Sequence, residues 1–124
     1  MYTNSANLPF RKILSIDFEY CGADGEVPKI VCMVIQDLRS GVVSRYWRDD
    51  LGKMNTPPFE TGEDVAIVSY FAPAEVQSMV ALSWTINVSV IDLFAEFRCQ
   101  TNGDPNVGRK SLVSALQFYG LKQF

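Results

Sequence analysis

The sequence predicts a mixed α/β domain with a five-stranded sheet flanked by helices. Three apolar runs rich in β-branched residues occupy the first part of the chain, and turn residues separate them. Two further strand-like runs then alternate with segments of helical periodicity. Three antiparallel strands followed by strand, helix, strand and helix give a mixed sheet. The 124 residues fit one domain, 1–124, with residues 1–11 as an N-terminal tail.

The first three strands are expected over residues 12–20, 30–35 and 42–47. The turn sequence from Gly22 to Gly25 separates the first two, and a tight turn ending at Gly41 separates the next two. The second run is apolar throughout, as expected for a strand covered on both faces. These segments predict an antiparallel meander.

The second half of the chain opens with an irregular segment containing charges, glycines and two adjacent prolines. Pro73 suits the first turn of the helix that follows the fourth strand, and Gly120 suits the end of the last helix. The expected elements, in order, are a loop over 48–64, a strand over 65–70, a helix over 74–82, a strand over 88–92, a short helix over 93–99 and a last helix over 111–119.

The predicted strand order is 3-2-1-4-5, with the first strand in the centre. The first strand carries two carboxylates, and the second is the most continuously apolar segment. Both need neighbouring strands to cover them.

Composition excludes several classes of protein. No apolar stretch is long enough to cross a bilayer, and the first ten residues lack the pattern of a signal peptide, which predicts a cytoplasmic protein with no membrane partner. The net charge is −3 and the basic residues are scattered, so broad adhesion to nucleic acid is not expected. The absence of histidine excludes an imidazole base or ligand from this chain. Cys21, Cys32 and Cys99 are expected to be reduced and mostly buried, with a disulfide framework as the alternative.

Asp17 and Glu19 are the first candidate functional pair. They are two positions apart on a strand, so both carboxylates project from one face while Ile16 and Phe18 point to the other. Two close carboxylates repel, and no Lys or Arg stands beside them on the apolar part of the strand, so a hard divalent cation is a natural partner. The alternative is a wet strand end at which both groups are solvated.

Two further carboxylates lie next to predicted helix starts. Glu75 falls in the first turn of the helix over 74–82, where it is either a functional group or a surface residue that compensates the helix dipole. Asp92 ends the fifth strand and precedes a helix, so it is either a helix N-cap or part of a site.

Taken in chain order, the segments around these residues resemble the motifs of a known family. The segments Ile16-Asp17-Phe18-Glu19, Val68-Ser69-Tyr70-Phe71-Ala72-Pro73-Ala74-Glu75 and Val90-Ile91-Asp92-Leu93 resemble the first motif, second motif and following strand of DEDD 3′-to-5′ exonucleases. These are the ribonuclease H-like proofreading domains of DNA polymerases, and the chain is most similar to those of family A-like polymerases. The resemblance extends from Ile13 to Leu121.

The resemblance implies a ribonuclease H-like fold and roles for individual residues. Asp17 and Glu19 match the first-motif carboxylates that hold two Mg²⁺ or Mn²⁺ ions, and Glu75 stands where such enzymes have an Asp. All three are therefore the expected catalytic and metal-binding residues. Asp92 matches an aspartate that supports the site from outside the set of metal ligands.

The family's fourth carboxylate lies on a later helix, beyond the His or Tyr that orients the attacking water, and this chain has no matching segment before Phe124. The resemblance therefore implies a C-terminally truncated or degenerate exonuclease-like domain. Such a domain is expected to bind one Mg²⁺ or Mn²⁺ weakly, because three carboxylates and no general base suit two-metal hydrolysis poorly.

The expected ligand is a nucleotide or the 3′ end of single-stranded DNA, bound weakly and with little turnover. Phe18, Tyr20 and Tyr70 are the expected substrate-binding residues, because aromatic rings can stack on a terminal base.

Two alternatives to this function remain open. One is a protein-interaction or regulatory module that uses the same scaffold without chemistry, and the other is an exonuclease completed by another chain. Apolar residues near the C-terminus, among them Leu116, Phe118 and Leu121, also predict a homodimer, because exposed apolar patches promote association.

Overall fold

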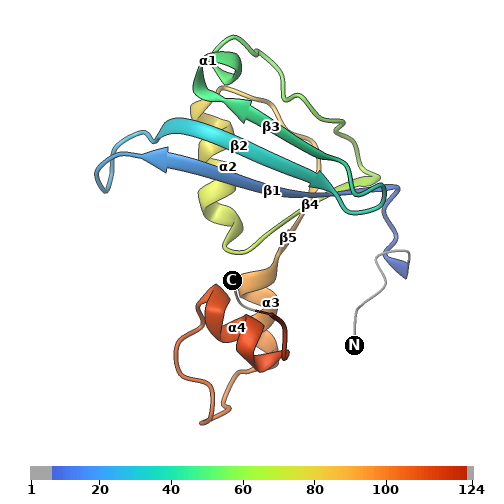
Figure 1. The fold of residues 1–124 in the computed structure, drawn as a ribbon, viewed down its shortest axis with the longest axis vertical. Coiled ribbons are helices and arrows are strands. Elements are labelled where there is room, and N and C mark those ends of the chain that lie inside the picture. Colours follow the sequence, from blue (N-terminus) through green and yellow to red (C-terminus); the bar gives the residue numbers. More distant parts are fainter. Residues whose placement is uncertain (1–6, 123–124) are drawn as a thin grey trace.

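The computed structural model describes residues 7–122. Residues 1–6 of the predicted N-terminal tail lie outside this range. Figure 1 shows the sheet with α2 crossing it on one side, and α3 and α4 gathered together beyond β5. In chain order the elements are β1 (Lys12–Cys21), β2 (Lys29–Asp37), β3 (Val43–Trp47), α1 (Arg48–Leu51), β4 (Val65–Ser69), α2 (Ala72–Ala81), β5 (Ser89–Asp92), α3 (Leu93–Gln100) and α4 (Leu112–Phe118).

The strand order β3-β2-β1-β4-β5 confirms the prediction, including the central position of β1. β1 pairs antiparallel with β2, and β2 pairs antiparallel with β3. β1 pairs parallel with β4, and β4 pairs parallel with β5. The sheet is therefore mixed, with the antiparallel meander on one side of β1 and the parallel strands on the other.

The two faces of the sheet differ in polarity. Alternate residues of β1, Leu14, Ile16 and Phe18, point into the main core, where Met33 and Ile67 from neighbouring strands join them. α2 packs on this core face of the sheet. The opposite face carries Asp17 and Glu19, both exposed. The alternation predicted for β1 is confirmed, and it separates the core from the candidate carboxylates.

The side of α2 that faces the sheet does not include its two valines. Val76 and Val80 are 39% and 66% exposed, whereas Glu75 is 6% exposed and Met79 is 1% exposed. The side that faces the sheet runs through Ala72, Glu75 and Met79, at the three- and four-residue spacing of one helical face. The helix therefore brings a carboxylate inside, at the cost of leaving two valines exposed.

The segment over 48–64 is more ordered than its sequence suggested. Its first four residues form the short helix α1, and Leu51 of this helix is buried in the core. The indole N–H of Trp84 donates a hydrogen bond of 3.0 Å to the carbonyl oxygen of Met54, and Phe59 packs edge-on against the Trp84 ring. Trp84 thereby attaches this loop to the core.

The end of α2 is closed by a Schellman motif that has serine where glycine is preferred. The N–H of Trp84 donates to the carbonyl of Met79, and the N–H of Ser83 donates to that of Val80. Ser83 has a φ of 60°, in the left-handed region that costs a residue with a Cβ about 1–2 kcal/mol.

We expect Ser83→Gly to stabilise the protein by about 0.5–1 kcal/mol, because relief of the left-handed strain exceeds the entropy that glycine loses on folding. Urea denaturation measures the change. Ser83→Ala is the matched control, and it keeps the strain because it keeps the Cβ. An equal gain in both variants would contradict this explanation.

Several surface features complete the fold. The three cysteines are free, as predicted, but Cys21 and Cys99 are exposed and only Cys32 is partly buried, which corrects the expected burial.

Phe118 and Leu121 are 48% and 40% exposed. The apolar C-terminal surface is therefore present, and the homodimer inferred from it stays a prediction. Within residues 7–122, no helix is long and apolar enough to span a bilayer.

Candidate functional site

The carboxylates of Asp17 and Glu19 project from the exposed face of β1. β1 continues past the end of β4, because the register with β4 stops at Ser15 and Val68. The main-chain edge of β1 beyond that point needs other hydrogen-bond partners. The two carboxylates therefore lie on a stretch of β1 that is not paired with the main chain of β4.

Side chains from the end of β4 and from α2 supply those partners. The hydroxyl of Ser69 donates a hydrogen bond of 2.9 Å to the carbonyl oxygen of Ile16. The N–H of Phe18 donates a hydrogen bond of 2.9 Å to Oε2 of Glu75. Glu75 therefore lies against the main chain between the two carboxylate-bearing residues of β1, although 57 positions separate it from Phe18 in sequence.

Burial perturbs the acidity of this group of carboxylates. Removal from water raises the pKa of Glu75 to about 7; the hydrogen bond from Phe18 opposes this shift, and the charges of Asp17 and Glu19 add to it. Burial, with a smaller contribution from Glu19, also raises the pKa of Asp17. The surface position that was the alternative for Glu75 is excluded. Asp17, Glu19 and Glu75 act on one another electrostatically, as the members of one site would.

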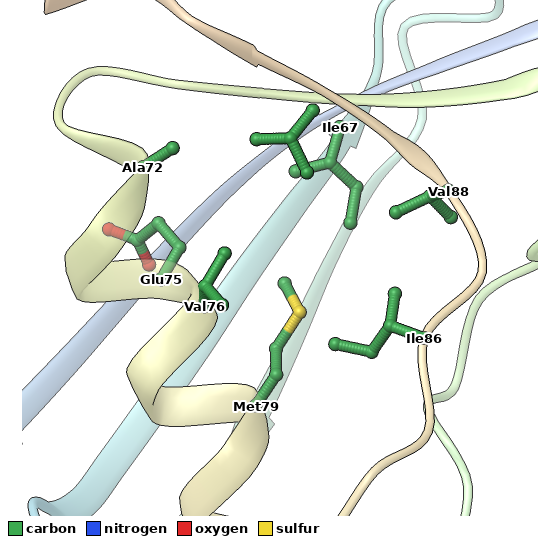
Figure 2. Close-up of a pocket in the computed structure, with 8 residues that line it drawn as sticks. Ile67, Ala72, Glu75, Val76, Met79, Ile86 and Val88 are labelled. Carbon is green, nitrogen blue, oxygen red and sulfur yellow. The ribbon is translucent and has the colours of Figure 1, made fainter.

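An apolar pocket of about 140 Å³ explains much of the desolvation of Glu75. Figure 2 shows Ala72, Val76 and Met79 of α2 directed toward Ile67, with Ile86 and Val88 on the other side. Glu75 is the only charged residue among those that line the pocket. A carboxylate beside such a lining loses hydration, which favours its protonated form.

Asp92 supports the start of α2 from the end of β5. Its Oδ1 accepts hydrogen bonds of 3.0 Å from the N–H of Phe94 and from the N–H of Phe71. The first bond is the helix N-cap that was one alternative for Asp92. The second holds Phe71, which precedes α2 in a left-handed conformation with a φ of 68°. Asp92 thus fixes the junction from which α2 carries Glu75 to β1.

The three aromatic residues expected to bind substrate lie in different surroundings. The Phe18 ring is 4% exposed and packs against Trp84, so only its main chain reaches the site. Tyr20 pairs with the core residue Ile30 across the strands, on the face opposite to Asp17 and Glu19. The Tyr70 hydroxyl donates to the carbonyl of Lys110, and its ring packs against Phe94. The Phe18 and Tyr20 rings therefore point away from the face that carries the carboxylates of β1, and the substrate-binding roles of the three residues stay predictions.

The oxygen atoms of these carboxylates are suitable ligands for a cation, but the side chains are not arranged around a common position. Hard divalent ions take oxygen ligands, and no ion pair of the described residues involves Asp17, Glu19 or Glu75. However, within residues 7–122 no three Asp, Glu, Cys or His side chains form a group that could hold a metal ion as placed. A shared cation therefore requires rotation of the exposed Asp17 and Glu19 side chains toward Glu75.

Ser69 is a site residue that the sequence did not single out. It is 5% exposed and lies at the end of the fully buried strand β4. A buried serine needs a hydrogen-bond partner, so a hydroxyl at the end of an otherwise apolar strand was the available signal. Its partner is the strand that carries the carboxylates.

Comparison with known proteins adds one finding. No family model matches the chain, and no curated protein sequence matches it. Among solved structures it is similar to the EXO domain of Nibbler from Aedes aegypti, with a TM-score of 0.51 over 86% of this chain and 56% of that one. This chain shares the fold of that EXO domain. Sequence identity is 10%, so the likeness concerns the ribonuclease H-like fold of five strands and flanking helices. This chain spans just over half the length of the chain it matches.

Proposed function

We propose that the chain is an exonuclease-like domain that binds one Mg²⁺ or Mn²⁺ weakly and, through it, the 3′ end of single-stranded DNA. The observation that carries the proposal is the bond between the Phe18 N–H and Glu75, which joins α2 to the strand bearing Asp17 and Glu19. The three residues come from two separate motifs, on β1 and α2, and they converge on one stretch of β1. The scaffold and the family resemblance support the same assignment.

A cation is the partner that this group of carboxylates lacks. The raised pKa values of Asp17 and Glu75 mean that ionised carboxylates repel one another or lack hydration there. A divalent cation would neutralise that repulsion and offer a coordination position to a phosphate oxygen. Asp17, Glu19 and Glu75 would hold it, and water would complete its coordination.

We propose little or no hydrolytic turnover for this chain alone. Hydrolysis by the two-metal route needs enough negative ligands to fix both ions and a group that activates water. The chain contains no histidine, and within residues 7–122 no group of three ligands is preformed. By resemblance, we propose that the domain corresponds to the proofreading part of a family A-like DNA polymerase.

Asp17→Asn is expected to abolish the response to Mn²⁺. The substitution removes a charged oxygen ligand with little change of shape, so the fold is retained while the site loses affinity. Calorimetric titration of the isolated chain with Mn²⁺ measures the loss. Asp24→Asn, in the exposed turn after β1, is the matched control and should bind as the wild type does. Unchanged affinity in Asp17→Asn would identify the carboxylates as a solvated strand edge.

A non-catalytic interaction module on the same scaffold is the second candidate function. It is favoured by the lack of a preformed metal group among residues 7–122 and by the exposed apolar residues Phe118 and Leu121. The same titration separates the two candidates. A wild-type chain that takes up no Mn²⁺ supports the interaction module, whereas robust exonuclease activity contradicts both.

A further inference from the structure

We infer that a single-stranded nucleic-acid segment lies across the open face of β1, β2 and β3, with a base stacked on Trp47 and a phosphate beside Arg45. This inference rests on the proposed function, because the strand is expected to lead to the carboxylates of β1. It adds a binding surface on β3, an edge strand that the proposed site does not include.

The strand register places the residues of this face in two rows. In one row Asp17 pairs with Val34, which pairs with Arg45. In the other, Glu19 pairs with Cys32, which pairs with Trp47. Cross-strand partners share a face, and neighbouring strands lie about 4.8 Å apart, so each row spans about 10 Å from the carboxylate on β1 to the β3 side chain.

The described helices that contact β2 and β3 leave this face of those two strands open. α1 and α2 are the helices with the main contacts to β2 and β3, and both pack from the core side, where Leu51 and Met79 are buried. Arg45 and Trp47 alternate along β3 with Ser44 and Tyr46, which are partly buried on the core side. Trp47 is 65% exposed, although a large indole ring is an unfavourable group to leave in water.

Trp47 and Arg45 together suit a nucleotide. An exposed indole offers a flat face on which any base can stack, and a guanidinium two residues away on the same face can pair with a phosphate oxygen. The partly buried Val34 and Cys32 give the floor between them and the carboxylates a largely apolar character. From β1 to β3, this face therefore changes from acidic to apolar and then to aromatic and cationic. This order suits a nucleic-acid strand whose last phosphate binds a metal ion beside the carboxylates.

Charge alone does not select the ligand here, because Asp49 and Asp50 follow directly in α1. Stacking is therefore expected to supply most of the affinity, with one phosphate contact from Arg45. The salt dependence should be shallow, with a slope of about −0.7 in log K against log salt for one contact to a single strand.

The test is the binding of a fluorescein-labelled oligothymidylate to the whole chain in the presence of Mn²⁺, followed by anisotropy. Trp47→Ala should weaken binding about tenfold to a hundredfold, and Trp47→Phe should retain part of the affinity because it keeps a ring. Arg45→Gln should lower the salt slope by about 0.7. Phe118→Ala and Arg109→Gln, an exposed ring and an exposed charge on other parts of the surface, are the controls.

Calorimetry with Mn²⁺ alone and the indole N–H resonance of Trp47 distinguish failure of this inference from failure of the proposed function. Loss of oligonucleotide affinity in Trp47→Ala with unchanged Mn²⁺ binding, and a shift of the indole resonance on binding, would support the inference. Equal oligonucleotide affinity in wild type and Trp47→Ala would overturn it and leave the proposed function standing. A wild-type chain that binds neither Mn²⁺ nor oligonucleotide would overturn both. An indole resonance that shifts with protein concentration alone would assign the face to a second copy and also overturn it.

Discussion

The free energy of unfolding is expected to decrease by about 3 kcal/mol as the pH rises from about 4.5 to about 7, because of Glu75. Its pKa is about 7 in the folded chain and 4.5 in the unfolded one, so between these values the folded state binds more protons. Stability therefore falls with rising pH in this window, and the difference of about 2.5 pH units corresponds to about 3 kcal/mol. The raised pKa of Asp17 acts in the same direction. Urea denaturation at a series of pH values measures the slope.

Glu75→Gln isolates this effect. Glutamine keeps an oxygen that can accept the hydrogen bond from Phe18 but carries no charge at any pH. The variant should match the wild type near pH 4.5 and exceed its stability by up to about 3 kcal/mol at pH 8. Glu63→Gln, at an exposed position, is the control and should leave the slope unchanged. A wild-type chain that becomes more stable between pH 5 and 7 would show that Glu75 is already ionised in the folded state.

Trp84→Ala is expected to destabilise the protein by about 3–5 kcal/mol, which is a large share of the stability of a small domain. Trp84 is 5% exposed and lies between the core and the loop over 48–64, in contact with Phe18 and Phe59. Its removal leaves a cavity and also frees the loop. The midpoint of urea denaturation gives the loss.

Trp84→Phe separates packing from the hydrogen bond. It retains an aromatic ring and loses only the indole donor to Met54, so it should cost about 1 kcal/mol plus a packing change. Trp47→Ala, which removes the other, exposed tryptophan, should change stability by less than either. If Trp84→Ala were as mild as Trp47→Ala, the core assignment of Trp84 would be incorrect.

The sheet was predictable because local patterns determine it. The alternation in β1 assigns Ile16 and Phe18 to one face and Asp17 to the other, whatever lies beyond the strand. The central position of β1 followed from the expectation that the first two strands both need neighbouring strands. Turn residues such as Gly41, with a φ of 80°, fixed the ends of the meander.

The burial of Glu75 could not be predicted in the same way. Val76, Met79 and Val80 stand at helical spacing in α2, but of these three only Met79 is buried, on the side that also buries Ala72 and Glu75. In this orientation Glu75 accepts the hydrogen bond from the N–H of Phe18, at the edge of β1 beyond its register with β4. This contact forms between two segments that are distant in sequence, so the sequence of neither segment predicts it alone.

The mixed pairing of β1 also bears on the order in which the chain folds. The meander of β1, β2 and β3 joins neighbouring segments through short turns, whereas pairing of β1 with β4 closes a loop of about fifty residues, as the separation of Arg11 and Asp64 illustrates. Closing the longer loop costs more chain entropy, so contacts across it form later than local ones. The carboxylates of β1 are thus in place while Glu75 is still distant. We therefore expect the complete carboxylate group to form late in folding.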